Sequence, residues 1–472
     1  MSLTPQSLRE HFNECEDVKF KIYPEQSTAS EQQPWGMVVY DWMMCDSTQL
    51  SETLLPAVSD EWNRSCSENR KPDPANLESV LSLQRITADM NTLIENVFSG
   101  MAVIILSGEN QFLAYNAAAD VNRSPEDTNT EIAIKGARDG FVESLETNIS
   151  LIRKRLKTTN MVYTSFSVGN ISPTKIGMVY LKDKVVPEAV TAITDKLNKY
   201  CGDSPAGPGE LIEHISPYKF SILPVFDYTG RPDYILDSLM RGRLALLIDG
   251  SPIAIIAPSS LMQFLFSAED PTLPYYFAFP WRILRLIGII FAVLLPGFYI
   301  ALMSYHQDQI PFPLLATVAN TRLGLPFPGL FEMIILLFLL SLLREAGIRM
   351  PAPVGSTITV VSGIIIGDAA IRGGLFSPTL TVIGAMSFVA GATISNQDLA
   401  ISTTLGRYFV LILSGVLGLF GFFIALFFVI QYSASHRPFG QPFFAPFSPF
   451  SWPKIFRNFM RFPGKNKKGG SL

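Results

Sequence analysis

Hydrophobic and polar positions alternate differently in the two parts of the chain. Up to about residue 280, short apolar runs such as AVIIL (102–106) and LALLI (244–248) are separated by polar stretches. Continuous apolar runs of this length indicate strands in a sheet that is buried on both faces. Beyond residue 280 the apolar runs become long enough to cross a bilayer. The pattern predicts an α+β region followed by an α-helical polytopic membrane domain.

The first region contains an internal repeat. GMVVYDW from Gly36 resembles GMVYLKD from Gly177, and VFSGMAVIILSG resembles LMRGRLALLIDG so that Gly100 corresponds to Gly242. In each copy a strand precedes a helical stretch (51–64 or 187–200) and then a hairpin turning at Ser-Gly or Asp-Gly. We therefore expect two repeated α/β subdomains, at 1–135 and 157–280.

The segment 136–156 connects the two copies. Phe141, Leu145, Ile149 and Ile152 recur at helical spacing, and the segment ends in basic residues. This pattern predicts an amphipathic linker helix.

Charge and motif content narrow the function of the chain. The 472 residues include 37 Lys and Arg and 41 Asp and Glu, a net charge of −4, so non-specific nucleic-acid binding has no electrostatic basis. Only 5 of the acidic residues and 14 of the basic ones lie after residue 280. The sequence has no dinucleotide-binding glycine motif, P-loop, G-x-S-x-G or H-E-x-x-H. We expect neither an enzyme nor a bound metal or cofactor.

Cysteine use and the polar N-terminus favour a cytosolic location for the first region. Its four cysteines include no C-x-x-C pair, and the first 14 residues lack the apolar core of a signal peptide. The tail 433–472 carries seven basic residues and no acidic one, which places it in the cytoplasm under the positive-inside rule. Both termini on one side require an even number of crossings.

Four spans satisfy this condition in the membrane domain, 281–432. The runs that we expect to cross are 286–303, 353–371, 375–394 and 409–432. The run 330–343 is shorter than the roughly 20 residues that a perpendicular span requires, contains Glu332 and stops at Arg344. It is predicted to be a short re-entrant or interfacial helix.

A stripe of small residues marks the run 353–371. Four members lie four residues apart: Gly355, Thr359, Gly363 and Gly367. Ser362 lies on an adjoining face, and the carboxylate of Asp368 follows Gly367, so that all six are candidate pore-lining residues. Such stripes usually allow helices to pack closely, but a carboxylate in a membrane segment often faces a water-filled path. Pore-lining and packing therefore remain equal alternatives on these grounds.

Two further groups of residues are candidates for function. Glu332 is expected to form a structural ion pair with Arg344 or Arg349, or alternatively to contribute to a ring of charges that selects cations. Candidate gating or assembly residues are Glu332, Arg344, Glu345 and Arg349. The turn formed by Arg231, Pro232 and Asp233 is either a ligand-facing turn or, more simply, a Pro-fixed loop in which Arg231 pairs with a nearby carboxylate.

Several long passages resemble one known family. GARDGFVESLETNISLIRKRL, GRPDYILDSLMRGRLALLIDGSPIAIIAP, LPFPGLFEMIILLFLLSLLREAGIRMPAPVG and PFGQPFFAPFSP occur in the order and spacing found in the A subunits of bacterial spore germinant receptors, the GerA family. The similarity extends from about residue 104 to residue 449. The family's usual G-Q-A-A reads GDAA here, with Asp368 in place of the amide.

The resemblance implies an oligomeric subunit of the spore inner membrane that acts with a transporter-like B subunit and a C-subunit lipoprotein. It also implies a ligand-gated channel that releases monovalent cations, with 354–370 as the pore-lining helix. This favours the pore-lining interpretation of the stripe. Two other functions remain open: a secondary transporter, and a passive membrane scaffold with a ligand-binding cytosolic domain.

Overall fold

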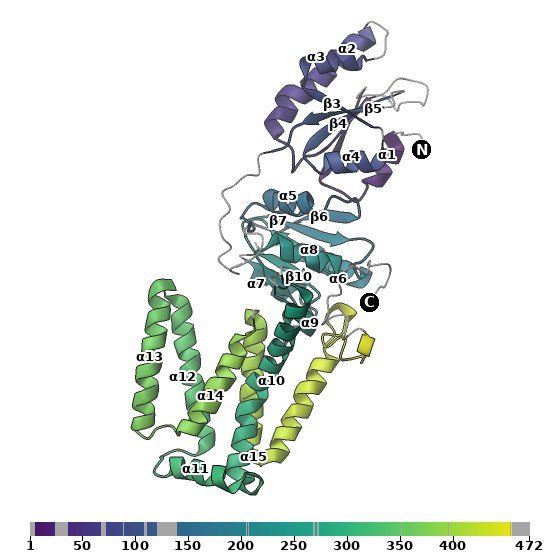
Figure 1. Cartoon of the computed structure of the whole chain (residues 1–472). Helices are drawn as coiled ribbons and strands as arrows, with labels where there is room; N and C mark the ends of the chain where they lie inside the picture. Colours follow the sequence, from purple (N-terminus) through teal and green to yellow (C-terminus); the bar gives the residue numbers. More distant parts are fainter. Residues whose placement is uncertain are drawn as a thin grey trace. The chain divides into compact units, whose positions relative to one another are not determined.

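A computed structural model shows two compact units (Figure 1). It describes residues 5–23, 36–67, 72–87, 89–107, 111–119, 139–203, 205, 207–267, 270, 273–350, 352–394, 396–453 and 455. Unit 1 comprises Met1–Pro217 and Phe226–Pro258, and unit 2 comprises Tyr218–Val225 and Ser259–Gly470. The main boundary therefore lies after Pro258, earlier than residue 280, and the segment Tyr218–Val225 belongs with the helical unit.

Unit 1 begins with an antiparallel sheet in the order β1-β2-β4-β5-β3. Its strands are β1 Val18–Tyr23, β2 Gly36–Asp41, β3 Leu83–Thr87, β4 Met101–Leu106 and β5 Gln111–Asn116. Its helices are α1 Pro5–His11, α2 Leu55–Ser67 (preceded by the π-helical turn η1, Gln49–Leu54), α3 Pro74–Val80 and α4 Met90–Val97. Ile104 of β4 lies in one apolar cluster and the adjacent Ile105 in another. Both faces of this strand are thus buried, as the sequence predicts.

A second antiparallel sheet follows, in the order β6-β7-β9-β10-β8. Its strands are β6 Met161–Val168, β7 Thr174–Leu181, β8 Asp227–Thr229, β9 Leu244–Ile248 and β10 Ala254–Ala257. Its helices are α5 Leu145–Arg155, α6 Pro187–Asn198, α7 Pro208–Ile215 and α8 Pro232–Met240.

The two sheets confirm the predicted duplication. Their strand orders are equivalent, and Gly36 pairs with Leu106 in the first sheet as Gly177 pairs with Leu247 in the second. Both partners are displaced by 141 positions, so the register of the sheet repeats together with the sequence. Gly242 has a φ of +84°, and a Cβ there would lie 2.4 Å from the carbonyl oxygen of Lys184, which requires glycine.

The helix predicted as a linker is part of a core. Leu145, Ile149 and Ile152 of α5 pack with Val179 and Leu247 of the second sheet. Its apolar stripe is therefore buried against its own subdomain, because a helix with one apolar face is stabilised by packing that face on a sheet. The segment belongs structurally to the second copy.

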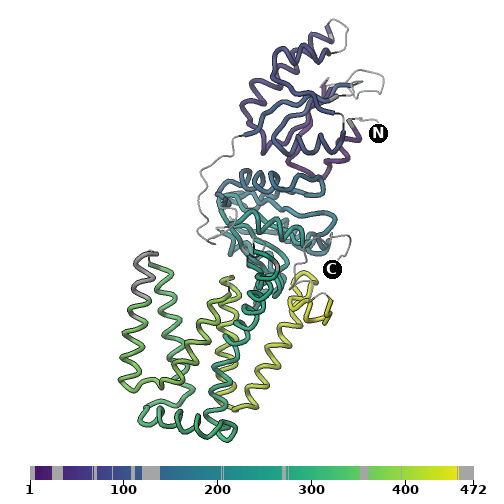
Figure 2. Tube along the Cα trace, viewed as in Figure 1, coloured from purple at the N-terminus to yellow at the C-terminus, as the bar shows by residue number. Residues whose placement is uncertain are grey.

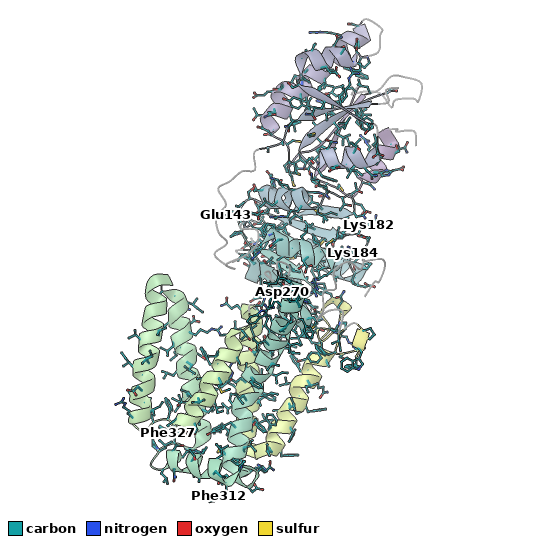
Figure 3. All side chains as sticks on the ribbon, in the orientation of Figure 1. Glu143, Lys182, Lys184, Asp270, Phe312 and Phe327 are labelled. Atoms are coloured by element: carbon teal, nitrogen blue, oxygen red, sulfur yellow. The ribbon has the colours of Figure 1, made fainter. Side chains whose placement is uncertain are left out.

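The helices of unit 2 lie after Ser259. They are α9 Leu261–Phe264, α10 Tyr275–Tyr305, η3 Gln307–Gln309, α11 Phe312–Arg322, α12 Gly329–Arg349, α13 Ala352–Arg372, α14 Pro378–Ala392, α15 Gln397–Ser435 and η4 Pro438–Gly440. Asp270 pairs with Arg282 and Arg285 near the start of α10. Figure 3 shows Asp270 at one end of this unit and Phe312 and Phe327 at the other.

Side-chain contacts fix the relative directions of the long helices. Gly288 near the middle of α10 faces Thr393, just after α14, whereas the hydroxyl group of Tyr299 further along α10 donates to Thr379 near the start of α14 at 3.2 Å. The two helices are therefore antiparallel. The path of the chain in Figure 2 agrees, and α12 runs parallel to α14 while α13 returns beside α12.

The last long helix reverses direction at Gly418. This residue has φ 65° and ψ −144°, which is not helical, and divides α15 into 397–417 and 419–435. The hydroxyl group of Ser402 donates to the carbonyl oxygen of Ile222, and the amide of Ile222 donates to the hydroxyl oxygen of Tyr432. The two halves therefore end near the same residue and form a helical hairpin (Figures 1 and 2). The prediction of one span across 409–432 is wrong, because glycine permits this break.

The run 330–343 also differs from its prediction. It lies within α12, a helix of 21 residues rather than a short re-entrant segment. Arg344 and Glu345 do not end the helix, which continues to Arg349. Glu345 pairs with Arg349 one turn later at 2.8 Å, and such i,i+4 pairs support a helix. Among the described residues, two helices are long and apolar enough to cross a membrane: Tyr276–Tyr305 and Gln397–Ser435, the second being the hairpin.

Candidate functional site

The small-residue stripe lies on α13, which packs against α12. Gly355, Thr359 and Ser362 occupy helical positions, but their side-chain surroundings lie outside the described part of the structure. At Gly363 and Gly367 an added Cβ would meet no atom within 4 Å. Exposed apolar residues lie beside these glycines: Val360, Ile364 and Ile365. The described glycines of the stripe therefore do not serve to pack α13 within a single chain.

Asp368 occupies the C-terminal end of this stripe. Its Oδ1 lies 2.8 Å from Nε of Arg372, one turn further along α13. The side chains are 57% and 79% exposed respectively. Exposed pairs of this kind contribute little stability, so Arg372 balances the carboxylate charge without fixing the helix in place.

Glu332 forms a different contact from the predicted ion pair. Its side chain is buried, and one oxygen accepts a hydrogen bond from the backbone amide of Ser377, the N-cap residue of α14. A carboxylate at this position is favoured by the unpaired amides and the dipole of the helix. The predicted partner Arg344 lies three turns further along α12, roughly 18 Å away at 1.5 Å per residue. The prediction of a pair with Arg344 or Arg349 is wrong.

The four candidate gating or assembly residues are therefore not one site. Glu332 lies in the first turn of α12, whereas Arg344, Glu345 and Arg349 lie near its C-terminal end. Arg344 and Glu345 line a cavity together with Arg407 of α15. Arg407 is not among the candidate residues predicted from the sequence, although a buried arginine within an apolar helix is a recognised signal of function.

The turn at 231–233 is a buried structural element of unit 1. Arg231 is 1% exposed, and its Nε and Nη2 donate to the carboxylate of Asp233 at 3.0 and 2.6 Å. Pro232 begins α8, where its fixed φ suits the first helical position. The geometry matches the simpler interpretation, in which Arg231 pairs with a nearby carboxylate.

A buried polar cluster that the sequence did not reveal joins the two halves of unit 1. Arg153 of α5 donates from Nε and Nη2 to Asp17, just before β1, at 2.5 and 2.9 Å. Both side chains are fully buried. Burial, reinforced by the charge of Asp17, raises the pKa of the neighbouring Asp41 carboxyl to about 7. Burial also raises the pKa of the Cys15 thiol to about 11, so this cysteine is not a reactive thiolate at neutral pH.

Comparisons with known proteins place the chain in a family. The family model described as Bacillus/Clostridium GerA spore germination protein matches residues 6–469. Spore germination protein XA of Bacillus anthracis is 38% identical over 456 residues, covering 97% of this chain and 92% of that protein. The uncharacterized membrane protein YfkQ of Bacillus subtilis (strain 168) is 30% identical over 389 residues, covering 82% and 76%.

Among solved structures, the N-terminal domain of the A subunit of the Bacillus megaterium spore germinant receptor GerK3 aligns at 20% identity with a TM-score of 0.37. The alignment covers 54% of this chain and 92% of that one.

The fold defines a class of protein in which a duplicated antiparallel α/β head is joined to an apolar helical bundle. The family match is far more specific than this architecture. The chain belongs to the GerA family of spore germination proteins.

Proposed function

We propose that this protein is the A subunit of a nutrient-responsive germinant receptor. In this proposal it lies in the spore inner membrane, assembles with copies of itself, and forms a ligand-gated channel that releases cations at the start of germination. Its family membership supports the germination role. The duplicated head would assemble the copies and couple them to a B subunit that binds the nutrient and to a C-subunit lipoprotein.

One observation carries the channel proposal: the two described glycines of the small-residue stripe have no packing partner in the part of the chain that the structure describes. Gly363 and Gly367 lie on α13, yet an added Cβ at either position would meet nothing within 4 Å. Small residues are favoured where helix backbones approach one another or where a narrow lumen must stay open. In a ring of copies, α13 would bring this stripe to the axis.

Helix directions support a topology with both termini on the cytoplasmic side. The segments α10, α12, α13, α14 and the two halves of α15 alternate in direction. If each passes through the membrane, six passes return the chain to its starting side. Six passes are an even number, as the charge pattern requires, but they differ in number and position from the four spans predicted from the sequence.

Charge at the end of the stripe is compatible with cation release. Asp368 is exposed on α13, and its partner Arg372 lies one turn nearer the helix end. A ring of Asp368 carboxylates would attract cations, and the neighbouring ring of Arg372 would reduce that attraction. If the Asp368–Arg372 ion pair forms in one state of the channel and is broken in the other, the electric field at the mouth of the pore would differ between the open and closed states.

The test is potassium flux through liposomes that contain the purified A, B and C subunits. We expect nutrient-dependent efflux, and we expect Gly363→Leu to reduce it at least tenfold because a bulky side chain would fill the lumen. Ile364→Leu changes the shape of an exposed residue next to the stripe and should leave the flux unchanged. Equal flux from Gly363→Leu in a normally assembled complex, or saturable nutrient uptake without ion current, would overturn the proposal.

A further inference from the structure

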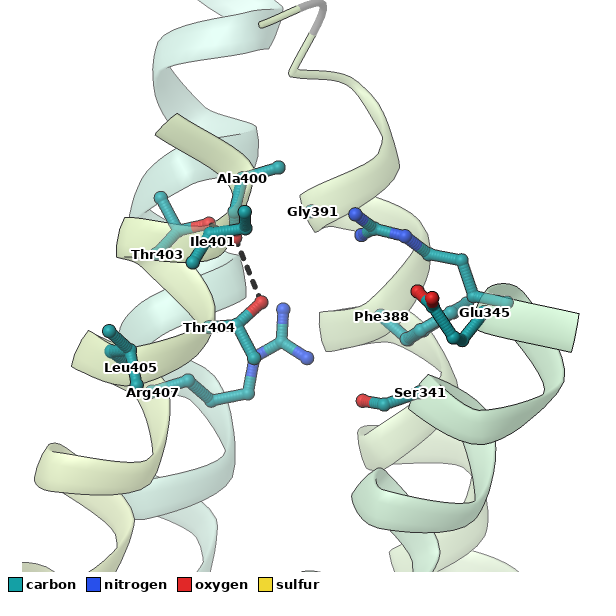
Figure 4. Close-up of a pocket in the computed structure, with 11 residues that line it drawn as sticks. Ser341, Glu345, Phe388, Gly391, Ala400, Ile401, Thr403, Thr404, Leu405 and Arg407 are labelled. Atoms are coloured by element: carbon teal, nitrogen blue, oxygen red, sulfur yellow. Dashed lines mark hydrogen bonds between the residues drawn. The ribbon is translucent and has the colours of Figure 1, made fainter. Parts of the chain in front are cut away.

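A cavity of about 240 Å³ lies within unit 2 between α12, α14 and the first half of α15. Figure 4 shows the side chain of Arg407 extending from α15 toward Ser341 and Glu345 on the opposite side. The lining combines charged groups with apolar ones, among them Phe388, Ile401 and Leu405. The cavity therefore offers both an electrostatic and a hydrophobic surface to a ligand.

Arg407 is a buried cation that has no counter-ion among the residues that the structure describes. Its side chain is 3% exposed, and its Nε donates to the carbonyl oxygen of Ala292 at 2.7 Å. Its Nη2 has one longer contact, 3.4 Å, with the carbonyl oxygen of Ser387. Within the described residues it forms no ion pair with a carboxylate. An unpaired guanidinium in an apolar helical bundle is costly, which points to a missing anionic partner.

A second guanidinium faces the same cavity. Arg344 lines it and, among the described residues, has no hydrogen-bonded or ionic partner. The carboxylate in the lining, Glu345, is already paired with Arg349 at 2.8 Å. The cavity thus has an excess of positive charge, and its two guanidiniums repel each other unless an anion lies between them.

The hydroxyl groups of the lining do not supply the main contacts to such an anion. Thr404 and Thr403 both donate to the carbonyl oxygen of Ala400 at 2.8 Å, and Ser341 donates to that of Leu337 at 2.8 Å. Each hydroxyl hydrogen is therefore used within its own helix. The guanidiniums remain the donors for a ligand, and arginine suits phosphate because its planar fork can donate two parallel hydrogen bonds.

The apolar part of the lining indicates the source of the phosphate. Ile401 and Leu405 are 51% and 52% exposed on α15, next to the charged groups. Basic pockets between membrane helices bind lipid headgroups, with apolar residues beside the acyl chains. We propose that this cavity binds a phosphate group, supplied by an anionic membrane lipid, between Arg344 and Arg407. The proposal depends on the membrane location proposed above but not on channel activity.

Gly391 is consistent with this assignment. A Cβ at position 391 would lie 2.9 Å from Nη2 of Arg407. Glycine therefore leaves space for the guanidinium to turn toward a ligand, and any larger residue would press against it.

The experiment measures phosphatidylglycerol binding to the full-length protein in a neutral detergent by native mass spectrometry. Arg344→Gln and Arg407→Gln should each weaken binding about tenfold or more, the effect expected for one charge-assisted contact. Arg437→Gln is the matched control, because it removes one exposed charge from the same unit without touching the cavity. Arg407→Lys should recover only part of the affinity, since lysine keeps the charge but not the fork.

Inorganic phosphate distinguishes the two sources of the group. If millimolar phosphate displaces the lipid from the wild-type protein and binds less well to Arg344→Gln, the site takes a free phosphate, and the phosphate assignment still stands. If phosphate does not compete and the variants lose lipid binding, a lipid is the ligand. Arg344 is partly exposed and has no hydrogen-bonded or ionic partner in the described part of the chain, so its substitution should not prevent folding. Equal lipid binding by folded Arg344→Gln and Arg437→Gln would overturn the proposal.

Discussion

The ion pair between Arg153 and Asp17 should be the main polar contact holding the two halves of unit 1 together. It is bidentate, fully buried, and joins α5 of the second copy to the start of β1 in the first. Arg153→Met would retain an unbranched apolar stem but remove the guanidinium cation. Asp17 would then be left buried without its partner.

The structure indicates the size of the effect. Breaking a buried ion pair by removing one partner costs about 3–5 kcal/mol. Here the guanidinium also lies 4.2 Å from the ring centroid of Phe98, and its Nη1 donates to the carbonyl oxygen of Thr158 at 2.9 Å. We therefore expect a loss in the upper part of that range. Folded domains are stable by only about 5–15 kcal/mol in total, so this loss is a large fraction of the stability of unit 1. Because the lost contact couples the two halves, we expect them to unfold in separate transitions.

Urea unfolding of a fragment covering residues 1–258, followed by tryptophan fluorescence, measures this loss. Asp17→Asn should cost a similar amount, and the double variant should be less destabilised than the sum of the single variants by about 2 kcal/mol. Arg85→Met is the matched control, because Arg85 holds Glu78 in the same bidentate geometry, at 2.5 and 3.0 Å, on the surface. The reasoning is refuted if Arg153→Met and Arg85→Met shift the unfolding midpoint equally.

Three further predictions concern Asp41, Gly418 and Asp368. Because the pKa of about 7 keeps buried Asp41 protonated in the folded state up to near pH 7, whereas the unfolded state ionises near pH 4, the unfolding free energy should fall by roughly 3 kcal/mol between pH 4 and 7. Asp41→Asn should flatten this slope in urea titrations. Gly418→Ala should lower the melting temperature in detergent, because a Cβ at position 418 would lie 3.0 Å from Tyr305. Gly363→Ala should not lower it, because a Cβ at position 363 would meet no atom within 4 Å. Asp368→Asn should preserve assembly but lower the cation selectivity of reconstituted flux; unchanged reversal potentials would remove this carboxylate from the mechanism.

The duplication in unit 1 was predictable because it leaves a direct trace in the sequence. Gly36 and Gly177 begin matching strands, and the buried runs that include Ile104 and Leu246 lack the alternation of a half-exposed sheet. Local pattern and backbone pairing agree here, so strand type, burial on both faces and the repeated register all follow.

The membrane half was less predictable because hydropathy does not record where an apolar run turns. Gly418 lies in an uninterrupted apolar sequence. That the chain reverses there and forms a helical hairpin is visible only from the backbone angles of Gly418 and from the contacts of Ile222. Arg344 and Glu345 suggested a helix end, yet an i,i+4 pair with Arg349 lets the helix continue. Composition therefore located the apolar segments but not their reversals.

Polar contacts between residues far apart in the chain could not be predicted from the sequence either. Asp17 and Arg153 are 136 positions apart, and neither belongs to a recognisable motif. The predicted partners of Glu332 are arginines on its own helix, because nearby sequence is the only guide to pairing, but its partner is the amide of Ser377, the N-cap residue of α14. Such pairs become visible only once packing has brought separate elements together.

Cysteine cross-linking at position 367 of α13 tests the central claim most directly. In membranes that carry all three subunits, Gly367→Cys in a chain whose native cysteines are replaced should react with a water-soluble maleimide. On oxidation it should form disulfides between copies of this chain. Neither labelling nor cross-linking, with the complex intact, would mean that the stripe faces lipid and that the chain does not line a pore.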